Sequence, residues 1–253
     1  MTVYLKQFTG TANVGDAASA VVVRHILKDP IRIVGQENQE RPNLIAIGSI
    51  LHWADKNSII WGSGLIHAEM VLPTAPRSIL AVRGPLTRAK LRSQGIECGD
   101  VFGDPGVLIS DVLPFPKMPR CGVGVVPHYC DVDEPFVARA RADGAVVIDP
   151  RWPLEKYLAA LTGCASVVSS SLHGLVFAHA YGIPAAWVNL SARVLGEGFK
   201  FHDYFESVGL PACKGFGSAD ALDTMLKACE LPAHSIDRAA LIDALVKARS
   251  LLV

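Results

Sequence analysis

The sequence lacks an excess of charge of either sign, because its 253 residues contain 24 Lys or Arg and 24 Asp or Glu. This balance excludes the broad basic surface that non-specific nucleic-acid binding requires, so we expect no nucleic-acid partner. Charged residues make up 19% of the chain and hydrophobic residues 50%, which is too apolar for an intrinsically disordered protein. The composition therefore predicts a compact protein with a sizeable core.

The chain also lacks a long apolar run and the features of a signal peptide. Residues 157–192 contain no Asp, Glu, Lys or Arg, but serines 169–171, His173 and Pro184 interrupt them. No stretch of about 20 apolar residues therefore remains to span a membrane. Residues 1–6 lack a basic flank followed by an apolar core. We expect a cytoplasmic protein.

The six cysteines include no Cys-x-x-Cys pair, and no His lies at zinc-ligand spacing from them. We interpret them as free thiols in a reducing compartment and expect neither disulfides nor structural zinc. No Asp-rich metal motif is present, so we expect no metal.

Short β-rich apolar runs alternate with helical patterns, which predicts an α/β fold with parallel strands. In the first half, we predict strands at 3–8, 44–47, 58–61 and 78–82 and helices at 16–27 and 85–94. In the second half, we predict strands at 122–126, 145–148, 166–169 and 185–188 and helices at 134–142, 154–162, 173–181, 219–229 and 235–252.

A linker is predicted at residues 113–119, because three prolines there exclude a helix interior. We therefore expect two Rossmann-like domains, residues 1–116 and 117–253, with the last helix packing back on the first domain. Two such domains face each other across a cleft at the carboxyl ends of their strands, where open α/β folds bind ligands.

The segment Ser169-Ser170-Ser171-Leu172-His173-Gly174 is the strongest candidate for a binding site. It follows a predicted strand and begins a predicted helix, so unpaired N–H groups, the positive end of the helix dipole and serine hydroxyls converge there. Such a position suits a phosphate or carboxylate, with His173 as ligand or proton donor. The alternative, that the serines only cap the helix and His173 packs under a loop, stays open.

Other polar residues also follow predicted strands. Arg83 is predicted to reach the cleft and pair with a carboxylate or phosphate, unless it forms a surface ion pair. Asn13 and Asp16 either cap the first helix or bind sugar hydroxyls. His128 is predicted to face the same cleft, although a lone histidine is more often structural.

Two further cations lie beyond the last predicted strand. Residues 200–204 are predicted to belong to a loop long enough to act as a flap. Lys200 and Arg193 could complete an anion site there, although solvated surface charges are the default for both. The segment 103–106, Gly-Asp-Pro-Gly, is interpreted as a turn.

Eight motifs, taken in order between residues 13 and 209, resemble those of the polysaccharide pyruvyl transferase family. They are Asn13-x-Gly15-Asp16, Ile47-Gly48-Ser49-Ile50-Leu51-His52, Trp61-Gly62-Ser63-Gly64, Val82-Arg83-Gly84-Pro85, Gly103-Asp104-Pro105, Val126-Pro127-His128, Ser170-Ser171-Leu172-His173-Gly174 and Lys200-Phe201-x-Asp203-Tyr204-x-x-Ser207-Val208-Gly209. The segment 48–52 and the short chain are most similar to ketal pyruvyl transferases of exopolysaccharides such as xanthan and succinoglycan.

This resemblance implies a GT-B-like arrangement, with residues 1–116 on the acceptor side and residues 117–253 on the donor side. It also implies phosphoenolpyruvate as donor and a saccharide as acceptor, with no separate cofactor. The implied acceptor is a lipid-linked oligosaccharide, so the enzyme would be peripheral at the inner membrane face. The oligomeric state stays open.

The family binds phosphoenolpyruvate through the Arg of Val-Arg-Gly-Pro and through Leu-His-Gly, so these roles carry over to Arg83, Leu172, His173 and Gly174. Many members have Arg immediately before Leu-His-Gly, where this chain has Ser171. A phosphate-binding cation is therefore missing, and Lys200 or Arg193 is the candidate substitute, beside the hydroxyls of Ser170 and Ser171.

Ketal formation needs anion clamps, a general acid and a general base. We predict Arg83 as clamp, His173 as phosphate ligand and acid, and His128 or Asp16 as base. The alternatives are a GT-B-like glycosyltransferase that uses a nucleotide sugar and a non-catalytic saccharide-binding relative.

Overall fold

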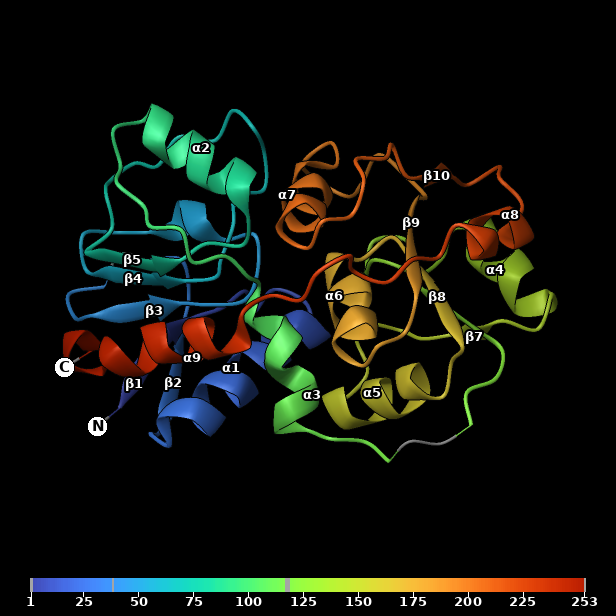
Figure 1. Ribbon diagram of the computed structural model, residues 1–253, viewed down its shortest axis with the longest axis horizontal. Coiled ribbons are helices and arrows are strands. Elements are labelled where there is room, and N and C mark those ends of the chain that lie inside the picture. The colour runs from blue at the N-terminus through green and yellow to red at the C-terminus, as the bar shows by residue number, and fades with distance from the viewer. Residues whose placement is uncertain (1, 38, 117–118, 253) are drawn as a thin grey trace.

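A computed structural model, which describes residues 2–37, 39–116 and 119–252, shows two five-stranded sheets whose strands are all parallel (Figure 1). The N-terminal sheet has the strand order β2-β1-β3-β4-β5, and the C-terminal sheet has the order β10-β9-β8-β6-β7. These sheets confirm the predicted α/β class with Rossmann-like layers. The likeness to GT-B enzymes stays a prediction.

The strands of the N-terminal sheet are β1 (Val3–Lys6), β2 (Ile31–Val34), β3 (Asn43–Ile45), β4 (Ser58–Trp61) and β5 (Ser78–Ala81). Those of the C-terminal sheet are β6 (Val123–Val126), β7 (Val146–Val147), β8 (Ser166–Ser169), β9 (Ala185–Asn189) and β10 (Phe216–Gly217). Most predicted strands are present with shifted ends. The edge strand β2 was missed, because it is short and half-exposed and carries no continuous apolar signal.

The α-helices are α1 (Val14–Leu27), α2 (Pro85–Ser93), α3 (Ile109–Val112), α4 (Pro135–Ala142), α5 (Leu154–Thr162), α6 (Leu172–Ala180), α7 (Phe199–Ser207), α8 (Leu222–Lys227) and α9 (Arg238–Lys247). Short 3₁₀ turns are η1 (Leu51–Trp53), η2 (Pro105–Leu108) and η3 (Arg249–Leu252). Among the helices within the described ranges, none has both the length and the apolar character needed to cross a membrane.

Local sequence explains where the helices begin. The Asn13 side chain accepts a hydrogen bond from the Gly15 N–H at 3.0 Å and so caps α1. Asp237 caps α9 by accepting from the Ala240 N–H at 2.9 Å, which starts this helix later than predicted. Pro85 occupies the first turn of α2, where its missing N–H costs nothing.

The predicted loop at residues 200–204 is wrong, because these residues lie in α7. Gly198, at φ +86°, turns the chain into this helix, and Phe201, Tyr204 and Phe205 are buried in the core. Their burial removes far more apolar surface from water than a mobile flap would. This segment is therefore a packed element, and Lys200 is fixed on its first turn.

The chain returns to the N-terminal sheet at its end. Helix α9 packs against β5 and α1, and Figure 1 shows it beside the first half of the molecule, with both termini on that side. The Trp61 Nε1–H of β4 donates to the Leu241 carbonyl at 2.8 Å. The predicted linker includes residues 117 and 118, which lie outside the described residues, so the boundary between 116 and 117 stays a prediction.

Candidate active site

The strand ends of the two sheets meet at a cavity of about 260 Å³, which we call the junction cavity. Its walls come from the segments that follow β1, β3, β4, β6, β8 and β9 and from the first turn of α7. This is the place where ligands bind in open α/β folds. The predicted site residues that line it are Asn13, Asp16, His128, Ser171, Leu172, His173 and Lys200.

Lys200 is the cation that the junction cavity offers. Its side chain is buried, and among the described residues no hydrogen-bond or ion-pair partner contacts it; its Nζ lies 5.5 Å from the centre of the Phe201 ring. Burial, with the nearby Arg83 charge, lowers the pKa of Lys200 to about 8. A buried ammonium without a counter-ion is costly unless an anion occupies the cavity. The cavity thus offers the Lys200 ammonium to an anion, and the role of Lys200 as the substitute cation stays a prediction.

Arg193, the other candidate cation, lies elsewhere. It is half-exposed, pairs with Glu134 and has its guanidinium 4.0 Å from Asp131. It does not line the junction cavity. Arg193 therefore lies apart from the predicted site residues that line this cavity, and its role as a substrate ligand stays a prediction.

Arg83 also lies outside the cavity. It is fully buried, and each nitrogen of its guanidinium has a protein partner: Nε donates to Asp203 at 2.9 Å, and the other two donate to the Ser49 hydroxyl and the Leu65 carbonyl, both at 2.7 Å. Gly64 is needed beside it, because a Cβ there would lie 2.3 Å from the guanidinium carbon. Each guanidinium nitrogen is thus already bonded to the protein, and the role of Arg83 as clamp of the substrate anion stays a prediction.

Arg83 instead connects the N-terminal half to α7. Asp203 of α7 receives, besides the Arg83 bond, hydrogen bonds from the Thr87 N–H at 2.9 Å and the Thr87 hydroxyl at 2.7 Å. Ser49, which accepts a hydrogen bond from Arg83, lines the junction cavity. Lys200 also lines it and lies on the same helix as Asp203. The buried pair thus positions two cavity residues without touching the cavity.

At the start of α6, Ser171 is the serine that faces the junction cavity. Its hydroxyl has no hydrogen-bond partner in the described parts of the chain, so it is available to a ligand. Ser170 is committed elsewhere: its hydroxyl donates to Asp131 at 2.7 Å and accepts from the His128 N–H at 2.8 Å. Ser170 therefore ties the ends of β6 and β8 together and differs from its predicted role in the donor site.

Gly174 is packed rather than exposed to a ligand. A Cβ there would lie 2.1 Å from the Ser169 Oγ and 2.9 Å from the Val126 side chain. Glycine lets α6 approach the strand end closely, and Gly174 does not line the junction cavity. The structure thus gives Gly174 a packing role, and its substrate contact stays a prediction.

Asp16 and His173 both line the junction cavity and are close enough for their charges to interact, and a third residue, Asp104, lies beside the histidine ring. Burial raises the pKa of Asp16 to about 6, and the charge of His173 partly offsets this. His173 Nε2 lies 3.4 Å from an oxygen of the fully buried Asp104. Gly15 allows α1 to contact the other side of the ring, since a Cβ there would lie 2.1 Å from His173 Nδ1.

Sequence reasoning missed Asp104, which was interpreted as part of a turn. The segment is a loop that leads into η2, where Asp104 accepts from the Gly106 N–H at 2.8 Å. A lone acidic residue among the apolar residues around 101–109 was the available signal. Ser49 and His52, known only as motif letters, also line the junction cavity.

His128 lines the cavity as a neutral imidazole. Burial, together with the charges of Lys200 and His173, lowers its pKa to about 3. Its Nδ1 accepts from the Cys130 N–H at 3.3 Å, which leaves the proton on Nε2. His128 is thus suited to donate a hydrogen bond, and Asp16 fits the role of base better.

No group of three or more His, Cys, Asp or Glu side chains is placed to hold a metal ion within the described ranges. The expectation of a reaction without a metal stays a prediction.

A sequence profile of the polysaccharide pyruvyl transferase family matches residues 13–191, more than half of the chain. The protein therefore belongs to this family, as its motifs indicated. It is 27% identical over 216 residues to the "Uncharacterized protein L143" of Acanthamoeba polyphaga mimivirus, which covers 82% of this chain and 75% of that protein. It is also 27% identical over 175 residues to the "Succinoglycan biosynthesis protein ExoV" of Rhizobium meliloti (strain 1021). That alignment covers 66% of this chain and only 54% of the relative.

Proposed function

We propose that this protein transfers a pyruvyl group from phosphoenolpyruvate to two hydroxyls of a saccharide and so forms a ketal during exopolysaccharide synthesis. The observation that carries this proposal is the unpaired, buried ammonium of Lys200 in a small cavity that also contains Asp16 and His173. Family membership supports pyruvyl transfer, and the name of the succinoglycan relative supports an exopolysaccharide product.

The donor's two anionic groups match the two positive features of the junction cavity. Lys200 supplies a full charge, and the start of α6 supplies N–H groups, the helix dipole and the Ser171 hydroxyl. Leu172 adds an apolar contact to the cavity beside Ser171. About 260 Å³ suits a three-carbon acid and is below the range of about 300–1,000 Å³ typical of drug-sized ligands.

The chemistry starts with a proton from His173 to the methylene carbon of phosphoenolpyruvate, which leaves an oxocarbenium-like centre at the adjacent carbon. A saccharide hydroxyl attacks this centre and gives its proton to Asp16. Inorganic phosphate then leaves with cleavage of the carbon–oxygen bond, and a second hydroxyl closes the ketal. One hydroxyl proton replaces the proton that His173 gave, and the other leaves with the phosphate.

The charges around each group fit these roles. Nε2 of His173 and the nearest oxygen of Asp104 lie 3.4 Å apart, and both are buried without a hydrogen-bond partner among the described residues, so this carboxylate is placed to orient the ring. The raised pKa of Asp16, about 6, lets it accept a proton near neutral pH. Asn13 and His128 offer hydrogen bonds to the same substrates.

We also propose that the two halves of the protein have the GT-B arrangement. The proposed acceptor is a lipid-linked oligosaccharide that the enzyme meets in the cytoplasm at the inner membrane face. Phosphoenolpyruvate serves as a substrate, and the scheme uses no separate cofactor.

The test substitutes Lys200→Met and measures phosphoenolpyruvate binding by calorimetry and acceptor-dependent phosphate release. We expect affinity to fall at least about tenfold, since a buried charged contact is worth about 1.5–3 kcal/mol. Lys56→Met, which removes an exposed lysine outside the cavity, is the matched control.

Wild-type affinity also has a predicted pH dependence. It should weaken as pH rises through about 8, because Lys200 loses its charge there, and K200M should lack this change. Unaltered binding by K200M, or stabilisation of the wild type by nucleotide sugars without any response to phosphoenolpyruvate, would overturn the proposal.

A further inference from the structure

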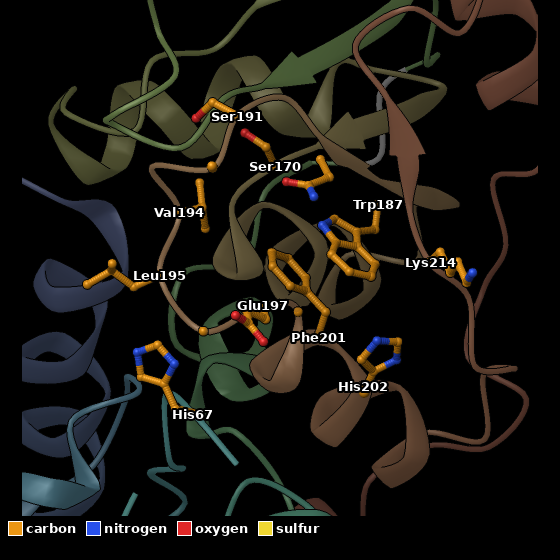
Figure 2. Close-up of a pocket in the computed structure, with 14 residues that line it drawn as sticks. His67, Ser170, Trp187, Ser191, Val194, Leu195, Glu197, Phe201, His202 and Lys214 are labelled. Atoms are coloured by element: carbon orange, nitrogen blue, oxygen red, sulfur yellow. The ribbon is translucent and has the colours of Figure 1, made fainter. Parts of the chain in front are cut away.

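A second cavity of about 520 Å³ adjoins the junction cavity, and we call it the aromatic cavity (Figure 2). Ser170 and Ser191 lie at one end of it, His67 and Leu195 on one side, and His202 and Lys214 on the opposite side. None of the groups assigned to proton transfer or donor binding above lines this cavity.

The two cavities are neighbours through shared walls. Leu195 lines both of them, and its side chain is 60% exposed. At the end of β8, Ser170 lines the aromatic cavity and the next residue, Ser171, lines the junction cavity. A ligand in the aromatic cavity therefore lies next to a donor bound at the start of α6.

One wall of the aromatic cavity is rigid and aromatic. The Trp187 indole stacks on Phe201 with ring centres 4.4 Å apart and an interplanar angle of 14°. Gly215 covers the indole as well, since a Cβ there would lie 2.8 Å from the ring. Phe201 and Gly215 thus cover the two faces of the indole, and with Trp187 6% and Phe201 1% exposed the pair gives the cavity a rigid, pre-formed apolar edge for the C–H groups of a ring.

The remaining lining combines apolar residues, such as Val194 and Leu195, with polar ones that include one carboxylate, Glu197, and one ammonium, Lys214. Asn189 and Glu197 are exposed, and their side chains form no hydrogen bond with any residue that the structure describes. His202 has a buried Nδ1 without a partner. Donors and acceptors are thus mixed, as hydroxyl groups require, because each hydroxyl both donates and accepts. The carboxylate of Glu197 counteracts Lys214 and disfavours a diphosphate.

Glu197 is held in an unusual backbone conformation. Its φ is +47°, and the flanking Gly196 and Gly198 have φ of +104° and +86°. A non-glycine residue in this region is uncommon, and such residues cluster at ligand-binding sites. The loop therefore presents the Glu197 carboxylate at the cavity despite a conformational cost.

We propose that the aromatic cavity is the acceptor site and binds a neutral hexopyranose of the saccharide, with Glu197 and Asn189 accepting and donating hydrogen bonds to its hydroxyls. The proposal rests on the proposed function, since it places those hydroxyls beside the donor. This placement differs from the expectation that residues 1–116 form the acceptor side. Among the described residues that line the aromatic cavity, His67 is the one that comes from residues 1–116.

The experiment fills the cavity and measures binding of methyl β-D-glucopyranoside and methyl β-D-galactopyranoside by saturation-transfer NMR, with and without phosphoenolpyruvate. Ala192→Trp places a large ring on an exposed lining residue, and Ala212→Trp places the same ring on an exposed residue outside the lining. We expect glycoside binding in wild type and A212W and at least about tenfold weaker binding in A192W.

Glu197→Gln keeps the size of the side chain and removes its charge. We expect about tenfold weaker glycoside binding, because hydrogen bonds to a charged group are worth about 1.5–3 kcal/mol. Phosphoenolpyruvate affinity of each variant is measured in parallel. Failure of the wild type to bind phosphoenolpyruvate would refute the proposed function and not this site.

Three results would overturn the acceptor site itself. The first is glycoside binding by A192W that equals binding by the wild type. The second is the absence of any glycoside signal in the wild type at about 50 mM glycoside, the weakest binding that the proposal allows. The third is binding of UDP-glucose that A192W abolishes, in a protein that binds neither glycoside. The last result would make this cavity a nucleotide-sugar site.

Discussion

At the scale of single residues, the junction cavity moves the pKa of an acid and of a base toward neutrality. Burial raises the pKa of Asp16 to about 6 and lowers that of Lys200 to about 8. Both shifts have the same physical cause, since low-dielectric surroundings disfavour the charged form. Groups displaced in this way, in one cavity, are typical of catalytic sites.

Asp16→Asn should remove one limb of the pH profile. As a base, Asp16 acts in its ionised form, so kcat/KM of the wild type should rise as pH increases through about 6. D16N should lack this rise, and its kcat/KM should be about 10²–10⁴-fold lower than that of the wild type. The prediction is checked by measuring phosphate release from about pH 5 to about pH 8, which spans the pKa of Asp16. An unchanged limb in D16N would exclude Asp16 as the base.

The same substitution should stabilise the fold at neutral pH. The pKa of Asp16 rises on folding from 3.8 to about 6, so the folded state binds the proton more tightly and stability falls as pH rises through this window. D16N escapes this loss and should gain about 1–3 kcal/mol in the free energy of unfolding at pH 8. The gain should disappear below pH 3.8. Urea denaturation at both pH values measures it, and a less stable D16N at pH 8 contradicts the prediction.

At the scale of elements, the decisive contact is the one between α2 and α7. The Arg83–Asp203 pair is fully buried and is supported by the two hydrogen bonds from Thr87. It holds a helix of the second half of the sequence against the first half. Lys200, three residues before Asp203 on α7, reaches the junction cavity because of this attachment.

Arg83→Met and Asp203→Asn should therefore have similar effects. Each leaves an unpaired buried group, which costs about 3–5 kcal/mol, and each should weaken phosphoenolpyruvate binding by displacing Lys200. The double variant should lose little more than either single variant, because the same interaction is removed. Denaturation midpoints and calorimetry complete the cycle. If R83M bound phosphoenolpyruvate weakly and D203N bound it normally, Arg83 would instead be a direct ligand of the substrate.

At the scale of the whole molecule, the end of the chain stabilises its beginning. Helix α9 packs on β5 and α1, and Leu241 and Leu245 are fully buried there. The hydrogen bond from Trp61 to the Leu241 carbonyl joins positions 180 residues apart. The packing of the N-terminal sheet therefore includes a helix that is far from it in the sequence.

Leu241→Ala should destabilise the protein by about 2–5 kcal/mol through lost burial and a cavity. Val246→Ala on the same helix, at a side that is 48% exposed, should change stability by no more than about 0.5 kcal/mol. Thermal unfolding compares the two variants. Equal effects would show that α9 does not stabilise the fold through its buried face.

The sequence by itself determined the alternation of strands and helices and seven of the residues that line the junction cavity. Segments such as 58–61, 154–162 and 166–169 have the predicted bounds because their apolar pattern and local signals act within a few residues. Asp16, His173 and Lys200 were predicted for the same site from their positions after strands or glycines. These features depend on neighbours in the chain.

Only the tertiary structure decided which charges stay free. Arg83 and Asp203 are 120 residues apart, so no local pattern could show that they neutralise each other and leave Lys200 unpaired. Asp104 behind His173, and the aromatic cavity beside the junction cavity, likewise arise from contacts between distant strand ends. The physical reason is that pairing and burial set the availability of a charged group, and both depend on packing between segments far apart in sequence.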